Sequence, residues 1–255
     1  MTGSRTTAPF DRLAFARAVL RTEAASIESA AERLGESFPK IVQMLSACRG
    51  RVAVTGIGKS ADVGQKLVGT LNSTGTRAYL LDAARAVHGD LGMVHETDVA
   101  LALSHSGESE EIVRLLGPLR KLASGLAAIT GNANSSLARA ADAAIAYGPI
   151  VEACPLALAP SSSTTVMLAI GDAIAFTLLE GRQFTADDFA RFHPGGSLGR
   201  KLATVEDAMR RGDELRIASE TGTVRAVFRR ANHEGRRPGA IMLGDAAGPL
   251  AAVVT

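Results

Sequence analysis

Short apolar runs alternate with helical patterns along the middle of this chain. The β-rich runs cover residues 52–55, 77–81, 99–103, 126–130 and 143–146. Helical patterns lie between them, near residues 60–73, 109–122 and 135–141. Strands that alternate with helices usually pair in parallel and are covered by helices on both faces. The sequence therefore predicts an α/β domain built on a parallel sheet.

Further helical patterns flank this alternation. Apolar residues recur at helical spacing over residues 10–48, with a break at Gly35 and Pro39. We interpret this stretch as an N-terminal helical arm that covers the domain and binds no ligand. A long apolar helix is predicted over residues 160–179, and the hydroxyl groups at its start suit N-capping.

Composition excludes several classes of function. With no Trp, two Tyr and a net charge of +2 in 255 residues, the chain lacks the aromatic and basic surfaces that bind nucleic acids. Cys48 and Cys154 have no metal-type spacing, so we expect a reduced protein in the cytoplasm. Residues 1–9 lack an apolar signal core, and no apolar run approaches the roughly 20 residues of a membrane helix. We therefore expect no membrane contact.

Two polar loops each follow an apolar strand and lead into a helix. The first has the sequence GIGKS (residues 56–60), and the second has the sequence SHSGES (residues 104–109). The first turn of a helix has unpaired N–H groups and a partial positive charge, so it attracts anions. Hydroxyl groups and Lys59 can add hydrogen bonds and charge. The pair predicts a ligand that carries a phosphate and hydroxyl groups.

The first loop alone has other interpretations. Glycine can serve a strand-to-helix turn for steric reasons only. Residues 56–61 also satisfy the dinucleotide pattern G-x-G-x-x-G/A, with Asp82 near the usual place of a ribose-binding acid. That interpretation puts Lys59 and Ser60 where the helix must approach, and it leaves the second loop without a role. A Walker A loop fails because Ala53 occupies its first glycine position.

Composition changes near residue 202. Strand-like runs at 203–205, 240–243 and 250–254 and a helix over 223–233 are predicted. Fewer than about sixty residues make a marginal hydrophobic core, so this segment looks like an incomplete domain.

Four motifs in order carry a resemblance to a known family. They read GIGKS, SHSGESEEI, EACPLALAPSSSTT and FHPGGSLGRKL. With them the chain resembles the sugar isomerase (SIS) family over about residues 12–203, and more narrowly the arabinose-5-phosphate isomerases that carry tandem CBS domains. The tail from Thr204 resembles the opening of a CBS domain. The resemblance implies a three-layer αβα sandwich with a five-stranded parallel sheet in residues 1–203 and a partial α+β CBS domain in residues 204–255.

The resemblance also implies an activity. The isomerases that the chain resembles interconvert D-arabinose 5-phosphate and D-ribulose 5-phosphate through an enediol. This reaction feeds the synthesis of Kdo and lipopolysaccharide. The resemblance implies a cytoplasmic homotetramer with sites between subunits, a phosphosugar as its small-molecule partner, and neither cofactor nor catalytic metal.

The family's catalytic positions fall on Lys59, Glu111, Glu152 and His193. Isomerisation needs a carboxylate to move a carbon-bound proton and a histidine to move protons between oxygens. We take Glu152 as the leading base and Glu111 as the second choice. His193 and His88 would open the ring, and Lys59 would stabilise negative charge. The positions expected to bind substrate are Gly58, Ser60, Gly75, Thr76, His88, Ser104, Ser106, Gly107 and Ser109.

Structural roles compete with each of these assignments. Glu111 lies in a first helical turn, where acids favour the dipole. Glu152 suits a solvated turn, His193 a helix end, and Lys59 a charged surface. Residues 82–85 replace a His-Pro-Gly-Glu stretch common in the family, so inhibition by metal should be weaker or differently placed. A phosphosugar sensor without activity, or an isomerase of another phosphosugar, remains an alternative function.

Overall fold

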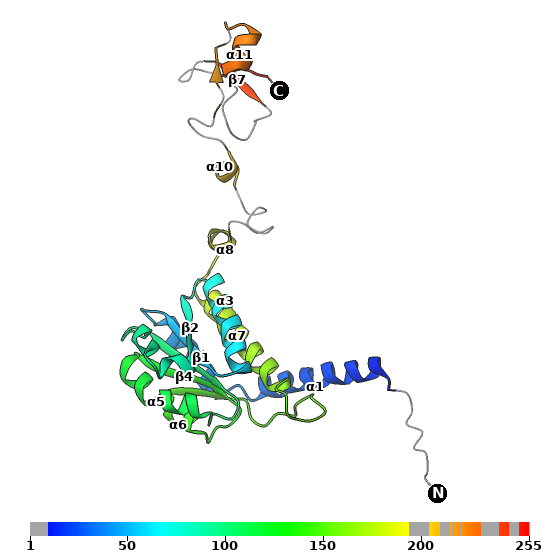
Figure 1. The fold of residues 1–255 in the computed structure, drawn as a ribbon, viewed down its shortest axis with the longest axis vertical. Helices are drawn as coiled ribbons and strands as arrows, with labels where there is room; N and C mark the ends of the chain where they lie inside the picture. The colour runs from blue at the N-terminus through cyan, green and yellow to red at the C-terminus, as the bar shows by residue number, and fades with distance from the viewer. Residues whose placement is uncertain are drawn as a thin grey trace. The chain divides into compact units, whose positions relative to one another are not determined.

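The structure, a computed structural model, describes residues 10–193, 204–209, 215, 217–219, 221–230, 240–244 and 250–254. The chain divides into two compact units, Met1–Pro194 and Gly195–Thr255. The first contains a five-stranded sheet and the second a three-stranded sheet (Figure 1).

The sheet of the first unit is parallel throughout. Its strands are β1 (Val52–Gly56), β2 (Ala78–Asp82), β3 (Val99–Ser104), β4 (Gly125–Thr130) and β5 (Ala143–Ala146), in the spatial order β2-β1-β3-β4-β5. The helices between them are α3 (Lys59–Ser73), α4 (Ala83–Ala86), α5 (Glu110–Leu122) and α6 (Ser136–Ala140), with a 3-10 turn at Asp90–Met93. All five predicted strands and the three predicted helices are confirmed to within one residue at each end, whereas the sequence analysis missed α4 and the 3-10 turn.

Helices cover both faces of this sheet (Figure 1). Side chains alternate between the faces along each strand, so Leu101 packs with Val54 in one core and Ala100 with Ala128 in the other. The first core is closed by α2 (Ser37–Ser46), α3 and α7 (Ser162–Gly181), and the second by α4, α5 and α6. The second core is lined on its sheet side mainly by alanines.

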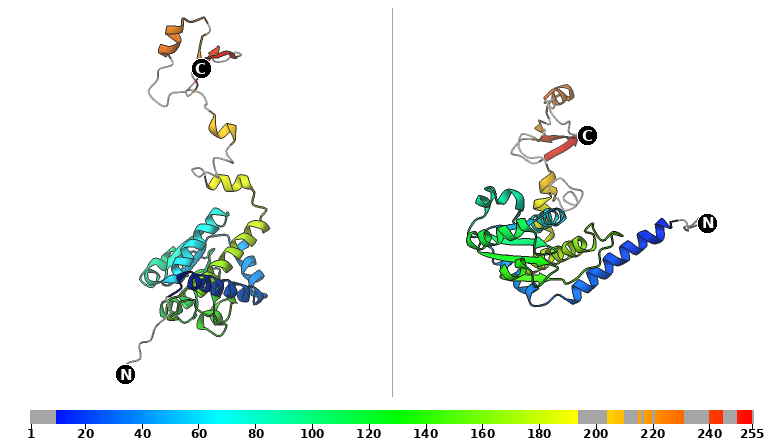
Figure 2. Two further views of the ribbon diagram at one scale, coloured as in Figure 1. Left: turned by 90° about the vertical axis from the view of Figure 1, so that its right-hand side faces the viewer. Right: turned by 60° about the horizontal axis from the view of Figure 1, so that its bottom comes forward.

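The predicted N-terminal arm consists of two helices. Helix α1 (Arg12–Glu32) begins at Asp11, whose carboxylate accepts hydrogen bonds from two first-turn N–H groups. Only Ser26 and Ala30 of α1 are buried, and the helix extends away from the sheet (Figures 1 and 2). The predicted break at Gly35 is confirmed, but Pro39 lies inside the first turn of α2. Proline is tolerated there because a first-turn N–H has no partner within the helix.

Helix α7 corrects two expectations. It is 20 residues long. By length and composition it is the one helix among the described residues that could cross a membrane. The expectation that no apolar run approaches that length was therefore wrong. Half of its most apolar window is buried, and it packs on α1 and α3. Its N-cap residue Ser161 makes no capping side-chain bond. The predicted hydroxyl cap is therefore wrong, and a carboxylate described below replaces it.

A short helix, α8 (Ala186–Phe192), follows α7 and was not predicted. Thr185 and Asp188 form a capping box, in which each side chain accepts a hydrogen bond from the other's backbone N–H. Their spacing in the sequence is the signal that could have revealed this helix.

The second unit has a small core. Its described elements are α10 (Val205–Ala208), β6 (Ile217–Ala218), α11 (Val224–Arg230), β7 (Ile241–Gly244) and β8 (Leu250–Val254). Strand β7 pairs parallel with β6 and antiparallel with β8, and Ala218, Val227 and Ile241 form the core. Both predicted later strands are confirmed. Val205 begins a helix, so the strand predicted at 203–205 is wrong there, and residue 203 lies outside the described residues. The assignment to a CBS domain stays a prediction.

A buried carboxylate joins the amino ends of three strands. Asp98 is 1% exposed, and it accepts hydrogen bonds from the N–H groups of Arg51 and His95 and from the hydroxyl of Tyr79. We expect Asp98→Ala to lower the free energy of unfolding by about 3 kcal/mol, because the buried carboxylate is lost and three part-buried donors lose their acceptor. Denaturant titration measures this. Glu110→Ala, which breaks an exposed ion pair, is the control and should cost less than about 0.5 kcal/mol. Equal losses in the two variants would contradict the prediction.

Candidate active site

The order of the strands creates a crevice between β1 and β3. The chain runs outward from β1 to β2 and then returns to place β3 on the other side of β1. Helix α3 follows β1 onto one face, while α5 follows β3 onto the opposite face. Gly56 and Leu103 are in register, so both loops leave the same edge of the sheet. Parallel α/β sheets bind their ligands at such a switch point. The two polar loops therefore flank one switch point of the sheet.

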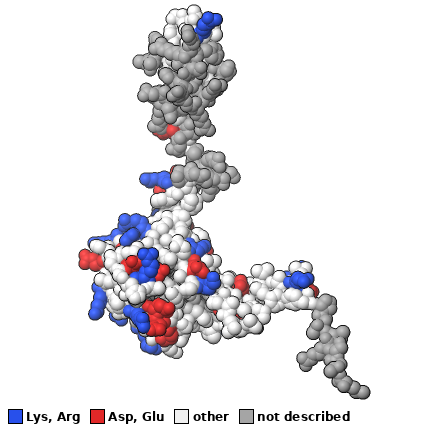
Figure 3. Space-filling model, in the orientation of Figure 1, with Lys and Arg blue, Asp and Glu red and all other residues white. Residues whose placement is uncertain are grey.

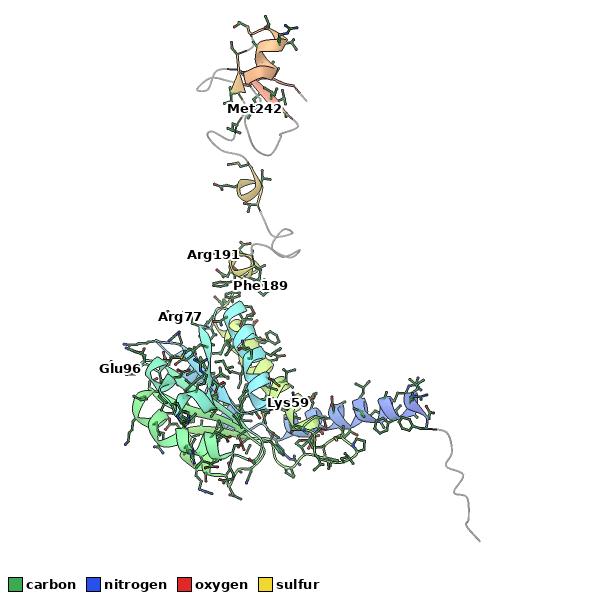
Figure 4. All side chains as sticks on the ribbon, viewed as in Figure 1. Lys59, Arg77, Glu96, Phe189, Arg191 and Met242 are labelled. Carbon is green, nitrogen blue, oxygen red and sulfur yellow. The ribbon has the colours of Figure 1, made fainter. Side chains whose placement is uncertain are left out.

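The first loop brings the N-terminus of α3 to this crevice. A Cβ on Gly56 would lie 2.9 Å from the backbone of Ser60, so only glycine permits this tight turn. Gly58 is the N-cap residue with a φ of +54°, a conformation that favours glycine. Lys59 opens the helix, as Figure 4 shows, and its Nζ lies 3.2 Å from Asp62. The Lys59 side chain is 69% exposed and therefore available to an anion that replaces Asp62 as its partner.

The second loop is held by its own hydroxyl groups. Oγ of Ser104, which is 3% exposed, accepts a hydrogen bond from the N–H of Gly107 and lies 3.3 Å from Oγ of Ser109. Gly107 has a φ of +66°, and a Cβ there would overlap Oγ of Ser135 at 2.1 Å. Ser106 is exposed and accepts a hydrogen bond from the N–H of Glu108. The sequence analysis did not identify Ser135, which shapes this loop from the start of α6.

Three acids stand at the start of α5 with different partners. Glu108 accepts a hydrogen bond from the N–H of Ser136, which lowers the pKa of the Glu108 carboxyl. Glu110 pairs with Arg114 one turn along the helix. Glu111 is half-buried in the first turn, and within the described part of the chain it has no hydrogen-bond or ion-pair partner. Glu111 is therefore the acid of this group that is free to act on a ligand.

The segment after β2 begins at the same edge of the sheet. Asp82 is in register with Gly56, and its carboxylate caps α4 through the N–H of Arg85. Asp82 therefore has a structural partner of its own, which further weakens the dinucleotide interpretation. Arg85 pairs with Asp90, and His88 between them is exposed. His88 follows the short helix α4, which begins at the edge that carries the two loops.

Glu152 caps α7. Its Oε2 accepts hydrogen bonds from the N–H and the hydroxyl of Ser161, at 2.7 and 3.0 Å, and a longer one from the N–H of Ser163. Partial burial by itself would raise the pKa of Glu152, but the hydrogen bonds from these serines outweigh it and lower the pKa. Glu152 is therefore ionised at neutral pH and fixed through one oxygen. The alternative of a solvated turn residue is wrong, because these bonds tie it to the helix.

Three expected site residues lie at the other end of the unit. Gly75 and Thr76 follow the C-terminus of α3, where the guanidinium of Arg182 donates to both. His193 ends α8, and its ring stacks on Phe189 with the centroids 3.9 Å apart. Figure 4 shows Phe189 at the opposite end of α3 from Lys59. Because α7 alone, with 20 residues, is about 30 Å long, one protomer does not bring these residues to the crevice. Residues 194–199, the rest of the His193 motif, lie outside the described residues.

Sequence reasoning gave no role to a pair of rings beside the second loop. Nδ1 of His105 lies 2.8 Å from the hydroxyl of Tyr147, and their rings stack. The two residues come from different loops, 42 positions apart. A histidine between the first two serines of the SHSGES loop was the available signal, but its partner could not be inferred without the fold.

This arrangement can hold a phosphorylated polyol and move protons on it. Two helix N-termini and several hydroxyl groups converge where an anion would sit, and a lysine stands beside them. Glu111 supplies a carboxylate in the first turn of α5. Within the described residues no group of three His, Cys, Asp or Glu side chains is arranged to hold a metal ion. Basic and acidic side chains are interspersed over the first unit in Figure 3.

Comparison with known proteins agrees with this geometry. A family model described as the SIS domain matches residues 44–177, which include both polar loops and Glu152. Arabinose 5-phosphate isomerase KdsD of Pseudomonas aeruginosa is 49% identical over 201 residues, which are 78% of this chain and 62% of that protein. Its namesake in Escherichia coli K12 is 44% identical over 217 residues, or 85% and 66% of the two chains. This chain thus spans somewhat less than two thirds of the length of either relative.

A solved structure carries the likeness into three dimensions. The structure of an Escherichia coli CFT073 protein in complex with arabinose 5-phosphate superposes with a TM-score of 0.70 at 37% identity, covering 74% of this chain and all of that one. The five-stranded parallel sheet with helices on both faces is the fold expected from the four motifs. Because the family model matches more than half of the chain, over the segment that builds the crevice, the chain belongs to the SIS family.

Proposed function

We propose that this protein interconverts D-arabinose 5-phosphate and D-ribulose 5-phosphate. The observation that carries the proposal is the crevice between β1 and β3, where the helix N-termini and hydroxyl groups of both loops converge in a chain 44–49% identical to proteins named arabinose 5-phosphate isomerase. The solved relative in complex with arabinose 5-phosphate supports the same class of ligand. The arabinose 5-phosphate formed in the reverse direction, from ribulose 5-phosphate, would feed the synthesis of Kdo and lipopolysaccharide.

The reaction moves two protons and needs no net oxidation. A base removes the proton from C2 of the open-chain aldose, and the enediolate takes a proton at C1 while the C2 hydroxyl becomes the carbonyl. Ser60, Ser104, Ser106 and Ser109 hold the phosphate and hydroxyl groups, and Lys59 stabilises the negative charge of the enediolate. His193 and His88 move protons between oxygens as the ring opens.

Glu152 is our first candidate for the carbon base and Glu111 the second. Glu152 is held ionised, as a base must be, and its Oε2 bonds leave Oε1 for the substrate. The lowered pKa weakens it as a base, because proton transfer is most efficient when the pKa lies near the working pH. Glu111 lacks such bonds and lies on the helix that follows the SHSGES loop.

We further propose a homotetramer whose sites are shared between subunits. Gly75, Thr76 and His193 lie at the opposite end of the protomer from Lys59, so a second copy would have to deliver them. Exposed apolar side chains on α1, just before it and on α7 support such contacts. They are Leu13, Leu20 and Ile27 on α1, Phe10 before it and Phe176 on α7. A reduced cytoplasmic setting is supported by the free thiols of both cysteines.

A panel of pentose and hexose phosphates tests the proposed reaction. We expect aldose–ketose exchange with arabinose 5-phosphate, followed by proton NMR in heavy water, where the C2 proton exchanges with solvent during turnover. Unphosphorylated arabinose should turn over at least about 100-fold less efficiently in kcat/KM, because it cannot use the two helix N-termini. If only a different phosphosugar turns over, that sugar is the substrate and the assignment of arabinose 5-phosphate is wrong. If no phosphosugar turns over, the proposed isomerase activity is refuted.

Paired variants separate the two candidate bases. We expect Glu152→Gln to lower kcat at least about 100-fold, the usual contribution of a general base, and Glu111→Gln to lower it less than about tenfold. Steady-state kinetics measure both, with thermal melting to confirm that each variant is folded. The reverse ranking would move the role of base to Glu111 and leave Glu152 as a cap of α7.

Mixing two inactive variants tests the shared site. Lys59→Ala and His193→Ala are each expected to be inactive alone. If one subunit supplies Lys59 and another His193, random mixing of the two chains leaves about a quarter of the sites intact, and activity should recover to about that fraction of wild type. Co-expression with two affinity tags isolates the mixed oligomer. A double variant mixed with wild type is the control for subunit exchange, and absence of recovery in a mixed oligomer would contradict shared sites.

A further inference from the structure

One hydrogen bond joins the SHSGES loop to the loop that follows β5. Nδ1 of His105 lies 2.8 Å from Oη of Tyr147, and the two rings stack at 5.7 Å with 17° between their planes. Tyr147 is 1% exposed and belongs to the core under α7, whereas His105 is partly exposed. One end of this pair is therefore fixed in the core, and the other reaches the candidate site.

The surroundings of His105 leave its ring little choice of position. A Cβ on Gly131 would lie 2.6 Å from Nδ1, so the glycine at the end of β4 makes room for the imidazole. The N–H of Gly131 donates to the carbonyl of His105. The backbone of Tyr147 is held as well, since its N–H donates to Thr130 and its carbonyl accepts from Arg33. Both partners are thus oriented before a ligand arrives.

The direction of the hydrogen bond follows from burial. Burial, with the nearby charge of Glu152, raises the pKa of Tyr147, so its hydroxyl keeps its proton at neutral pH. A buried O–H without an acceptor is costly, and within the described residues Nδ1 of His105 is the acceptor it has. Tyr147 therefore donates to Nδ1, and the proton of the neutral imidazole is on Nε2.

We propose that Tyr147 is a positioning residue that makes His105 present an Nε2–H donor to an oxygen of the bound sugar phosphate. His105 lies between Ser104 and Ser106 in the SHSGES loop, which leads into the N-terminus of α5. Its Nε2 has no hydrogen-bond partner among the described residues. A donor in that place adds to the hydroxyl and N–H groups that face an anion. This inference rests on the proposed function, because it assigns a further contact to the same substrate.

The contact has a kinetic signature. A donor that binds the ground state and the transition state equally changes KM and leaves kcat unchanged. We expect Tyr147→Phe, which removes one oxygen and keeps the ring in the core, to raise KM for arabinose 5-phosphate about fivefold with kcat within about twofold. His105→Ala should raise KM at least as much. His105→Gln, whose amide N–H can replace Nε2–H, should restore KM to within about twofold of wild type.

A double-mutant cycle shows whether Tyr147 acts through His105. In a His105→Ala background, Tyr147→Phe should raise KM no further. Tyr79→Phe is the matched control, since it removes the hydroxyl of the other tyrosine, which bonds Asp98 at the amino ends of the strands, and it should leave KM unchanged. An equal rise from Tyr147→Phe in both backgrounds would overturn the proposal in favour of packing alone. An unchanged KM in His105→Ala would overturn it outright.

The tautomer provides a test that does not need activity. In wild type labelled with nitrogen-15 histidine, we expect the His105 resonances to show a protonated Nε2 and an unprotonated Nδ1, identified by their loss in His105→Gln. Tyr147→Phe should redistribute the proton between the two nitrogens. A proton fixed on Nδ1 in wild type would overturn the proposal even if isomerase activity is found. The expected tautomer without turnover of arabinose 5-phosphate would refute the proposed substrate and support the donor geometry.

Discussion

The parallel pairing of β1 with β3 is the constraint on which the candidate site depends. Since these strands are in register and their helices leave for opposite faces, the N-termini of α3 and α5 converge on one crevice. The turns that permit this are tight enough to exclude a side chain at Gly56 and Gly107. The hydroxyl groups and the charged side chains of the two loops are therefore close enough to contact one ligand.

A second dependence runs through Glu152. The same carboxylate that would accept a carbon-bound proton also satisfies N–H groups at the start of α7. Such bonds fix the geometry and hold the charge, but they draw electron density from the oxygen that makes them. In the proposed mechanism Oε2 keeps its hydrogen bonds to the start of α7, and Oε1 accepts the proton from the substrate. The cap also explains why three consecutive serines at this helix start do not cap it themselves.

Sequence patterns predicted the strands and helices of the first unit because each is set by local periodicity. They could not predict the strand order, which depends on long-range packing, although that order creates the crevice. Local rules also misjudged the start of α7, where Glu152 from an earlier loop replaces the serine cap, and the short helices, which contain too few residues to show a period. The motif resemblance grouped His193 with Lys59, whereas the protomer separates them. The sites between subunits that the resemblance also implied stay a proposal.

The sheet meets α5 with short side chains. Ala100, Ala102 and Ala128 are fully buried in one core with Ile112 and its neighbours. Alanine loses no rotamers when it is buried, which keeps the entropic cost of this layer low. The layer is also tightly packed, so a methyl group added to one of these alanines would displace α5. Changes at these remote positions would therefore alter ligand affinity through the height of the α5 N-terminus, and evolution could tune the site from the interior of the sheet.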